Sequence, residues 1–142
     1  MLVQLIYSSR VASSVDNAAI RDILAKSQAN NRRQAITGAL CFSGTWFLQS
    51  LEGERAAINR LYSRLITDAR HSDSQVLSFE EIAARDYTDW DMGYVAITAE
   101  NRQLFLKYST SNELDPPSLS AASVRGLFRD LAARANWLRK QP

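Results

Sequence analysis

Phe47-Leu48-Gln49-Ser50-Leu51-Glu52-Gly53 places a single amide inside an apolar run. In a strand, Gln49 would share one face with Phe47 and Leu51, because successive side chains alternate between the two faces. A buried amide without partners costs about 1–3 kcal/mol, so Gln49 needs hydrogen bonds from the fold or from a ligand. Residues 2–7 have the same alternating pattern and put Tyr7 on their inner face. Tyr7 is therefore the expected protein partner of Gln49.

Length and composition indicate one compact domain. The chain has 142 residues, of which 46% are hydrophobic, and its net charge of +2 is too small to predict a nucleic-acid or membrane surface. Its single cysteine, Cys41, and single histidine, His71, exclude an internal disulfide and a metal site built from several such ligands. We interpret Cys41 as a small buried hydrophobe. With no signal-peptide pattern and no apolar run of ~20 residues, we expect a soluble, cytoplasmic protein without a membrane segment.

Strand and helix patterns alternate along residues 2–97. Strand 2–7 and a loop at 8–12 precede a helix that starts at Ser13, where Ser13 and Asp16 resemble a capping box. A hairpin of strands 35–42 and 46–51, a helix over 54–68, a strand over 75–83 and a last strand ending at 97 follow. This order predicts an α+β, ferredoxin-like sandwich with a five-stranded mixed sheet and both helices on one face. In the loop and fifth strand, Trp90 and Met92 are expected to point the same way, as core or as a cofactor wall.

The last third of the chain predicts a helical extension. A short helix over 101–108 and a loop with Pro116-Pro117 lead to a helix over 120–138. That helix carries an apolar stripe of Val124, Leu127, Phe128, Leu131, Ala135 and Leu138. The free face of the sheet and a partner subunit are both possible places to bury it. We therefore divide the chain into residues 1–97 and an extension over 98–142.

Three features of the first part allow two interpretations each. The apolar stripe of the first helix continues onto Ser27, Asn30 and Asn31, which either end the helix or form the wall of a polar pocket. Arg60 and Arg64 lie at positions i and i+4, where they either face solvent or bind a phosphate. Gly38, within a strand, indicates either a bulge or close approach by another group.

Four motifs share their order and spacing with one known family. They are Leu5-Ile6-Tyr7-Ser8-Ser9; Asn30-Asn31 with Ile36-Thr37-Gly38-Ala39-Leu40; Phe47-Leu48-Gln49-Ser50-Leu51-Glu52-Gly53; and Trp90-Asp91-Met92. Together they resemble the BLUF family of blue-light sensors that use FAD, in register over residues 2–97. The tail is similar to that of the short stand-alone BLUF proteins. Asp91 departs from the family pattern, in which serine is more usual, and this departure affects how we expect the loop to settle in the dark and lit states.

The resemblance implies a noncovalent FAD between the two helices that pack on the sheet, with FMN or riboflavin as possible substitutes. Asn31 would meet the amide edge of the flavin ring, since an asparagine amide offers both a donor and an acceptor. Arg64, with Arg60 or His71, would meet the ribityl or phosphate portion, and Gly38 would permit close packing near the ring. The implied cofactor-binding residues are Tyr7, Ser27, Asn30, Asn31, Arg32, Gln49, Arg64 and His71.

The mechanism that the resemblance implies involves no substrate turnover, so we do not expect an enzyme. Tyr7 would give an electron and a proton through Gln49 and regain both, leaving Gln49 rotated or tautomerised, with Trp90 and Met92 as the signal relay. Because no output domain is recognisable, we expect a homo-oligomer and a downstream signalling protein. The alternative, an acylphosphatase-type hydrolase, would need a tight anion loop before the first helix, which this sequence lacks, and it would leave Gln49 unexplained. A single-stranded RNA binder needs exposed aromatic residues where the central strands are mainly aliphatic.

Overall fold

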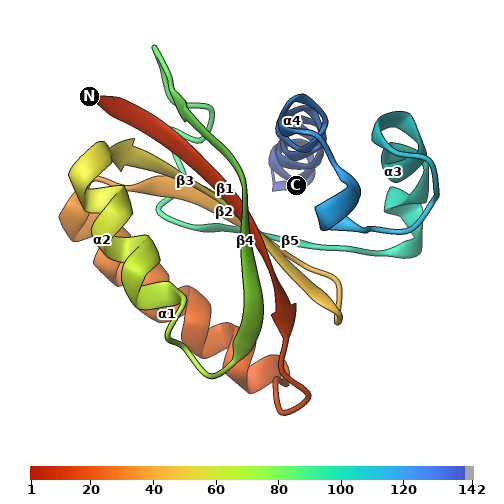
Figure 1. Ribbon diagram of the computed structural model, residues 1–142, viewed down its shortest axis with the longest axis horizontal. Coiled ribbons are helices and arrows are strands. Elements are labelled where there is room, and N and C mark those ends of the chain that lie inside the picture. The colour runs from red at the N-terminus through yellow and green to blue at the C-terminus, as the bar shows by residue number, and fades with distance from the viewer. Residues whose placement is uncertain (140–142) are drawn as a thin grey trace.

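Five strands form one mixed sheet with helices on both faces (Figure 1). The computed structural model describes residues 1–139, without the side chains at positions 96, 100 and 135–139. The strands are β1 (Leu2–Val11), β2 (Thr37–Phe42), β3 (Trp46–Glu54), β4 (His71–Glu81) and β5 (Gly93–Ala96). Their order is β4-β1-β3-β2-β5, in which β2 and β5 are parallel and the other neighbours antiparallel. The predicted α+β sandwich with a five-stranded mixed sheet is confirmed.

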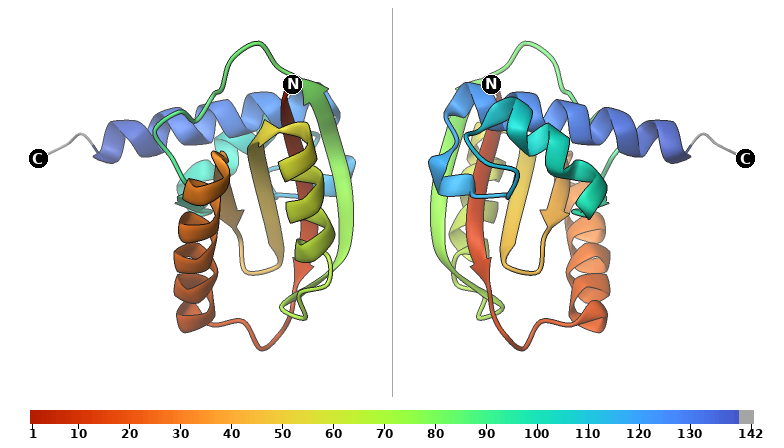
Figure 2. Two further views of the ribbon diagram at one scale, coloured as in Figure 1. Left: turned by 90° about the vertical axis from the view of Figure 1, so that its left-hand side faces the viewer. Right: turned by 90° about the vertical axis from the view of Figure 1, so that its right-hand side faces the viewer.

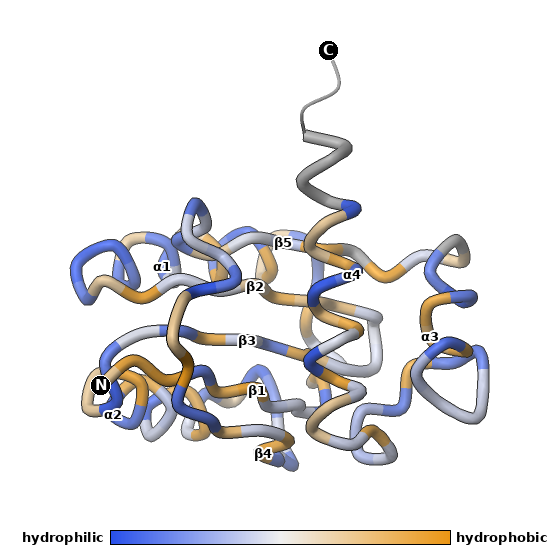
Figure 3. Tube along the Cα trace, turned by 90° about the horizontal axis from the view of Figure 1, so that it is seen from above, coloured by the Kyte–Doolittle hydropathy of each residue, from blue (hydrophilic) through white to orange (hydrophobic). Residues whose placement is uncertain are grey.

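The helices make two outer layers. Helices α1 (Asn17–Gln34) and α2 (Arg55–Leu65) cover one face of the sheet, and α4 (Ala121–Arg139) crosses the strands on the other face (Figure 2). The short helices η1 (Ala99–Asn101), α3 (Arg102–Tyr108) and η2 (Pro116–Ser118) connect β5 to α4. Seen from above, apolar and polar segments alternate along the strands and the flanking helices (Figure 3). No helix between residues 1 and 139 has the length and apolar character needed to cross a membrane.

Because side chains alternate along the strands, the apolar residues form two separate clusters, one on each face of the sheet. The cluster under α1 and α2 contains Val3, Leu5, Tyr7, Ile20, Leu40, Phe47, Leu51, Ile58, Leu61 and Met92. The cluster under α4 contains Ile6, Ala39, Cys41, Leu48, Tyr87, Trp90, Val124, Leu127, Phe128 and Leu131. The stripe of the last helix is thus buried on the sheet of its own chain, up to Ala132. Ala135 and Leu138, which the sequence adds to this stripe, lie outside the described side chains. Cys41 is buried as expected, and burial raises the pKa of its thiol.

Two predicted boundaries near the amino terminus are wrong. Residues 8–11 continue strand β1 instead of forming a loop, because β4 also begins earlier than predicted, at His71, and pairs with β1 as far as Val11. Helix α1 starts at Asn17, and its N-cap is Asp16, whose Oδ1 accepts a hydrogen bond from the Ala19 amide at 2.8 Å. Asp16 therefore caps the helix itself and does not act as the third residue of a capping box that starts at Ser13.

The β2–β3 hairpin lies at the centre of the sheet, where β3 also pairs with β1. Gly44, in its turn, has φ of 90°, a conformation that glycine adopts without strain. The register of β1 and β3 then places Tyr7 directly opposite Gln49. At Gly38 the pairing with β3 is regular, so there is no bulge, and a Cβ atom would collide with the Ser50 carbonyl oxygen. The close approach indicated by Gly38 is that of the neighbouring strand.

Candidate functional site

The site is built around the pair that the β1–β3 register brings together. The Tyr7 hydroxyl donates a hydrogen bond to Gln49 Oε1, which confirms Tyr7 as the partner of this buried amide. Burial, together with nearby Tyr62 and Asp68, raises the pKa of the Tyr7 phenol, so it remains a donor. Because Gln49 accepts through its oxygen, its Nε2 points to Met92 Sδ, 3.5 Å away. A thioether is a weak acceptor, and the amide nitrogen therefore retains capacity to donate to a stronger one.

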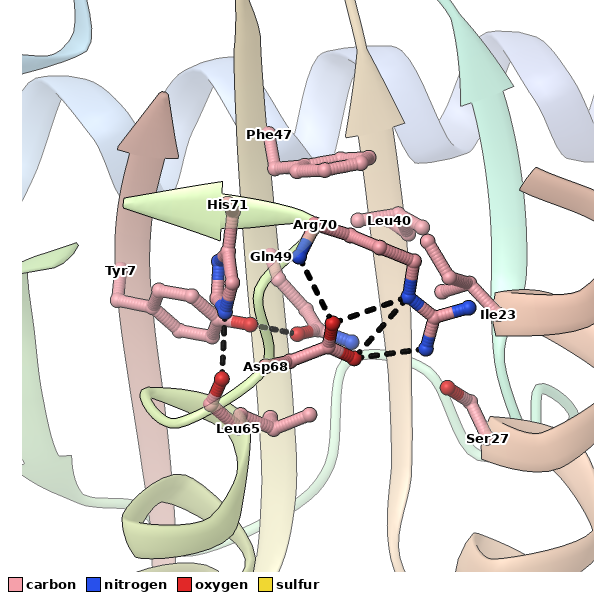
Figure 4. Close-up of a pocket in the computed structure, with 10 residues that line it drawn as sticks. All are labelled: Tyr7, Ile23, Ser27, Leu40, Phe47, Gln49, Leu65, Asp68, Arg70 and His71. Carbon is pink, nitrogen blue, oxygen red and sulfur yellow. Dashed lines mark hydrogen bonds and ion pairs between the residues drawn. The ribbon is translucent and has the colours of Figure 1, made fainter. Parts of the chain in front are cut away.

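A small cavity of about 40 Å³ lies beside this pair, between α1, the end of α2 and the sheet (Figure 4). Its apolar lining residues are Ile23, Leu40, Phe47 and Leu65, and its polar ones are Tyr7, Ser27, Gln49, Asp68, Arg70 and His71. Apolar walls with a few convergent polar groups are typical of ligand sites, although most such sites measure roughly 300–1,000 Å³. Four predicted site residues, Tyr7, Ser27, Gln49 and His71, therefore meet at one cavity.

Asp68 and Arg70 line the cavity, and the sequence analysis missed both. Arg70 forms ion pairs with Asp68 at 2.7 Å and with Asp22 of α1 at 2.9 Å, so it ties the turn before β4 to α1. The Arg70 guanidinium, hydrogen-bonded to Asp68, lowers the pKa of that carboxyl to about 2. The signal in the sequence was the run Asp68-Ala69-Arg70-His71, in which opposite charges directly precede the single histidine.

His71 is held in place by two neighbouring elements. Its Nδ1 lies 2.6 Å from Ser9 Oγ of β1, and its Nε2 contacts the Leu65 carbonyl oxygen at the end of α2. The imidazole also meets the Tyr7 and Phe47 rings edge-on, with centroids 6.5 and 6.2 Å away. His71 is thus a positioned wall of the cavity.

Two other residues of α1 predicted to contact the cofactor, Asn31 and Arg32, bind the loop before β5. Asn31 is buried, and its Nδ2 donates to the Asp91 carbonyl oxygen at 2.7 Å. Arg32 pairs with the Asp91 carboxylate at 3.0 Å. Because α1 continues to Gln34, the asparagines do not end the helix. Neither Asn30 nor Asn31 lines the cavity beside Tyr7, so their place in a pocket wall stays a prediction.

A second hollow of about 460 Å³ is lined by the end of α1 and by α2. Its lining residues are Gln34, Ala57, Asn59, Arg60, Ser63 and Arg64. Arg64 reaches α1, where its Nη2 donates to Asn30 Oδ1 at 3.5 Å. Arg60 and Arg64 are exposed, and no ion pair with a described carboxylate is found for either. This hollow therefore offers two guanidinium groups to an anion.

Trp90 and Met92 do not point the same way, which corrects the sequence prediction. Met92 packs in the cluster with Tyr7, whereas Trp90 packs under α4 with Tyr87. Strand β5 begins only at Gly93, so both residues lie in the preceding loop, where strand alternation does not apply. The Trp90 indole folds against Gly93, where any Cβ atom would collide with it. The loop thus passes from one face of the sheet to the other.

Comparison with known proteins agrees with this geometry. The family described as sensors of blue light using FAD matches residues 2–93. The chain is 29% identical over 92 residues to the beta subunit of a photoactivated adenylate cyclase from Euglena gracilis, and 29% identical over 87 residues to the blue light- and temperature-regulated antirepressor BluF from Escherichia coli. These matches cover 64% and 61% of this chain but only 11% and 22% of those relatives.

Solved structures match nearly the whole chain. The photo-activated state of BlsA, 27% identical, superposes with a TM-score of 0.86 over 92% of this chain and 94% of that one. The dark state of BlrB, described as a BLUF protein, is 30% identical and superposes with a TM-score of 0.76 over 94% and 96% of the two chains. The Tyr7–Gln49 pair, the cavity beside it and these matches lead to one assignment. The chain belongs to the BLUF family, the sensors of blue light that use FAD.

Proposed function

We propose that this protein senses blue light with a noncovalently bound FAD and signals through the hydrogen-bonded pair Tyr7 and Gln49. The observation that carries the proposal is the buried bond from the Tyr7 hydroxyl to Gln49 Oε1, made at the edge of a cavity. The other end of the Gln49 amide, Nε2, meets only the weak acceptor Met92 Sδ among the described residues. The pair can therefore change its hydrogen bonds without breaking the fold.

The cavity residues fit a flavin in chemical type. Ile23, Leu40, Phe47 and Leu65 suit the faces of a flat aromatic ring, and Gln49 Nε2 supplies a donor for its polar edge. The volume of about 40 Å³ means that lining side chains must move apart to admit three fused rings. Arg70 is the best candidate to move, since its partners Asp22 and Asp68 are both partly exposed.

The remaining contacts predicted from the sequence are part of this proposal. Asn30, Asn31 and Arg32 would line the side of α1 toward the ring. Arg60 and Arg64, on the hollow between α1 and α2, would meet the phosphates, since a guanidinium group binds phosphate oxygens through a planar fork of donors. The division into residues 1–97 and a helical extension over 98–142 also stays a prediction.

A bound flavin supplies absorption of blue light and, once excited, a strong acceptor for one electron. Because the pKa of Tyr7 is raised, its proton does not leave on its own. Proton transfer must therefore accompany loss of an electron from the Tyr7 phenol. Gln49 Oε1 is the atom placed to take that proton. When the electron and the proton return, Gln49 can remain rotated or tautomerised, with its contact to Met92 Sδ changed. No substrate is consumed in this cycle.

An absorption spectrum before and after blue light tests the proposal. We expect the purified protein to be yellow and to show a small red shift that reverses in darkness. Release of the pigment by heat, followed by chromatography, should identify chiefly FAD. A colourless protein that takes up no flavin on refolding would contradict the proposal, as would loss of the visible band in place of a shift.

We infer further that the response acts through the segment from Trp90 to Leu138 on assembly or on a partner protein. Rearranging one or two hydrogen bonds supplies only about 1–3 kcal/mol, enough to shift a balanced equilibrium roughly tenfold to a hundredfold. The expected outcome is a homo-oligomer whose size or partner binding changes with light, with Trp90 and Met92 as the relay. Light scattering in darkness and under blue light, on the wild type and on Met92→Ala, measures this directly. Unchanged size together with no light-dependent partner would contradict it.

A further inference from the structure

Glu52 is a buried carboxylate three residues from Gln49, on the opposite face of β3. Glu52 is 0% exposed. It lies on the same face of β3 as Leu48, which packs under α4. Oε2 accepts hydrogen bonds from Gln4 Nε2 at 3.0 Å and from the Asp86 amide at 2.6 Å. Oε1 accepts from Thr37 Oγ1 at 2.9 Å and from the Tyr87 amide at 3.0 Å. A carboxylate has about four acceptor positions, so all of them are used.

The two backbone donors belong to the start of the loop between β4 and β5. Arg85 holds the same point from the other side, because its guanidinium donates to the Glu52 carbonyl oxygen at 3.2 Å and to Thr37 Oγ1 at 2.9 Å. It also donates to the Ala35 carbonyl oxygen at 2.8 Å. Residues 85–87 are thereby bound to β2 and β3 on the face that α4 covers.

The end of this loop is bound on the opposite face. Asn31 and Gln28 of α1 donate to the carbonyl oxygens of Asp91 and Met92, at 2.7 and 3.2 Å, and Gln49 Nε2 meets Met92 Sδ. Residues 85–92 thus lead from the face of the sheet under α4 to the face that carries Tyr7 and Gln49. The two ends of this segment are held differently. The Glu52 carboxylate, with all its acceptor positions used, holds residues 86 and 87, whereas the contacts of Met92 include the weak one between its Sδ and Gln49 Nε2.

Aromatic side chains connect the middle of the loop to α4. Tyr87 stacks on Trp90 with ring centroids 5.9 Å apart, and it meets Phe128 of α4 edge-on at 6.4 Å. Asp86 adds a polar contact, because its carboxylate lies 3.4 Å from Arg129 Nε of α4. A displacement of residues 88–92 relative to residues 85–87 therefore changes the stacking of Trp90 on Tyr87 first, and it reaches α4 through the contact of the Tyr87 ring with Phe128.

We infer that Glu52 is the positioning residue that couples the hydrogen bonds of Gln49 to α4. Glu52 holds the backbone of residues 86 and 87, so that a change at the Gln49–Met92 contact moves residues 88–92 against a fixed point. Trp90 then shifts the Tyr87 ring, which contacts Phe128. Without that anchor, the loop absorbs the change. The inference rests on the proposed photosensory function and names its route to the output helix.

Glu52→Gln tests the inference in the full chain with flavin bound. The substitution keeps the shape but replaces one acceptor oxygen with an NH₂ group, which cannot accept from a backbone amide. We expect flavin binding and the red shift to persist, because Tyr7 and Gln49 lie on the other face. We expect the light-minus-dark difference in amide hydrogen exchange over residues 121–134 to fall at least about fivefold, the lower end of typical coupling between two sites.

Glu54→Gln is the matched control. Glu54 lies on the same strand and pairs with the terminal amine at 2.7 Å, but it is exposed, so the α4 difference should match that of the wild type. If Glu52→Gln does not fold, Thr37→Val decides. It removes one donor to Glu52 and one acceptor of Arg85 at nearly constant shape, and it should weaken the α4 difference while keeping the red shift.

Two results for the variants would overturn the inference. An unchanged α4 difference in Glu52→Gln, or in Thr37→Val where that variant decides, would leave Glu52 a purely structural group. Joint loss of the red shift and the α4 difference would place it in the photochemical site instead. A wild type without any red shift would refute the proposed function itself, whereas a wild type with the red shift but no change in α4 would refute only this inference.

Discussion

The two faces of the sheet differ, and we propose a different task for each. Under α4 the side chains interlock with little exposure: Ile6, Leu48, Val124, Leu127, Phe128 and Leu131 are each at most 1% exposed. Both faces bury polar groups and carry partly buried apolar side chains, but under α1 and α2 a cavity remains beside Tyr7 and Gln49, whose amide nitrogen meets the weak acceptor Met92 Sδ. A photochemical site needs polar groups that can rearrange, whereas an output element responds as a unit only if it is well packed. One sheet separates the two.

Tyr7→Phe should have the largest effect, complete loss of the red shift. The change removes the phenolic donor to Gln49 while keeping nearly all of the buried volume, so folding and flavin binding should survive. Gln49→Leu should behave likewise. Difference absorption spectra in the dark and after blue light measure the loss.

Tyr62→Phe is the control for this prediction. The Tyr62 ring lies 5.2 Å from that of Tyr7, but its hydroxyl bonds to Ser74 Oγ at 2.7 Å and not to Gln49. Its red shift should therefore persist. A normal photocycle in Tyr7→Phe would mean that the photoactive role is assigned to the wrong residue.

Leu131→Ala and Ile23→Ala should separate the two faces by stability. Leu131 is 1% exposed under α4, and its truncation should lower the free energy of unfolding by about 3–5 kcal/mol, because the packed neighbours cannot close the void. Ile23 is partly buried and already borders a cavity, so its truncation should cost about 1 kcal/mol. Chemical denaturation of the flavin-free proteins measures both. Equal losses would show that the faces are packed alike.

Acid should weaken the α1–α2 face through Asp68. Arg70 lowers the pKa of Asp68 from 3.8 to about 2, so the folded protein binds fewer protons than the unfolded chain between those values. The contribution of Asp68 is thus present above about pH 4 and is lost as the pH falls toward 2. Asp68→Asn should reduce the loss of stability between pH 4 and pH 2, measured by denaturation. Glu113→Gln, which removes a carboxylate at an exposed position, is the matched control.

Asp91→Ser, which restores the more usual family residue, should have the smallest effect on stability. The Arg32 and Asp91 side chains are 73% and 38% exposed, and such a pair contributes about 0–1 kcal/mol. The Asn31 bond to the Asp91 carbonyl oxygen does not need the carboxylate and should persist. Recovery of the dark spectrum after illumination should change in rate if the pair holds the loop in one state. An identical rate would show that the pair has no such role.

Local pattern in the sequence was sufficient for the elements and for the central pair. Period-two alternation in β1 and β3 put Tyr7 and Gln49 on inner faces, and helical periodicity placed α2 and α4 within a few residues of their observed ends. It failed at Ser13 and at residues 8–11, where the capping of α1 by Asp16 and the pairing with β4 decide the boundaries. Boundaries depend on long-range partners, which local pattern does not contain.

By itself, the sequence determined the α+β sandwich, the family and the polar pair at the centre of the sheet, because these depend on residue type and spacing along the chain. The tertiary structure alone decided that Trp90 and Met92 lie on opposite faces, that Arg70 bridges Asp22 and Asp68, and that Glu52 binds the loop of residues 85–92. Each of these contacts joins segments distant in the sequence or lies in a loop without period. Only the folded chain brings such groups within hydrogen-bonding distance.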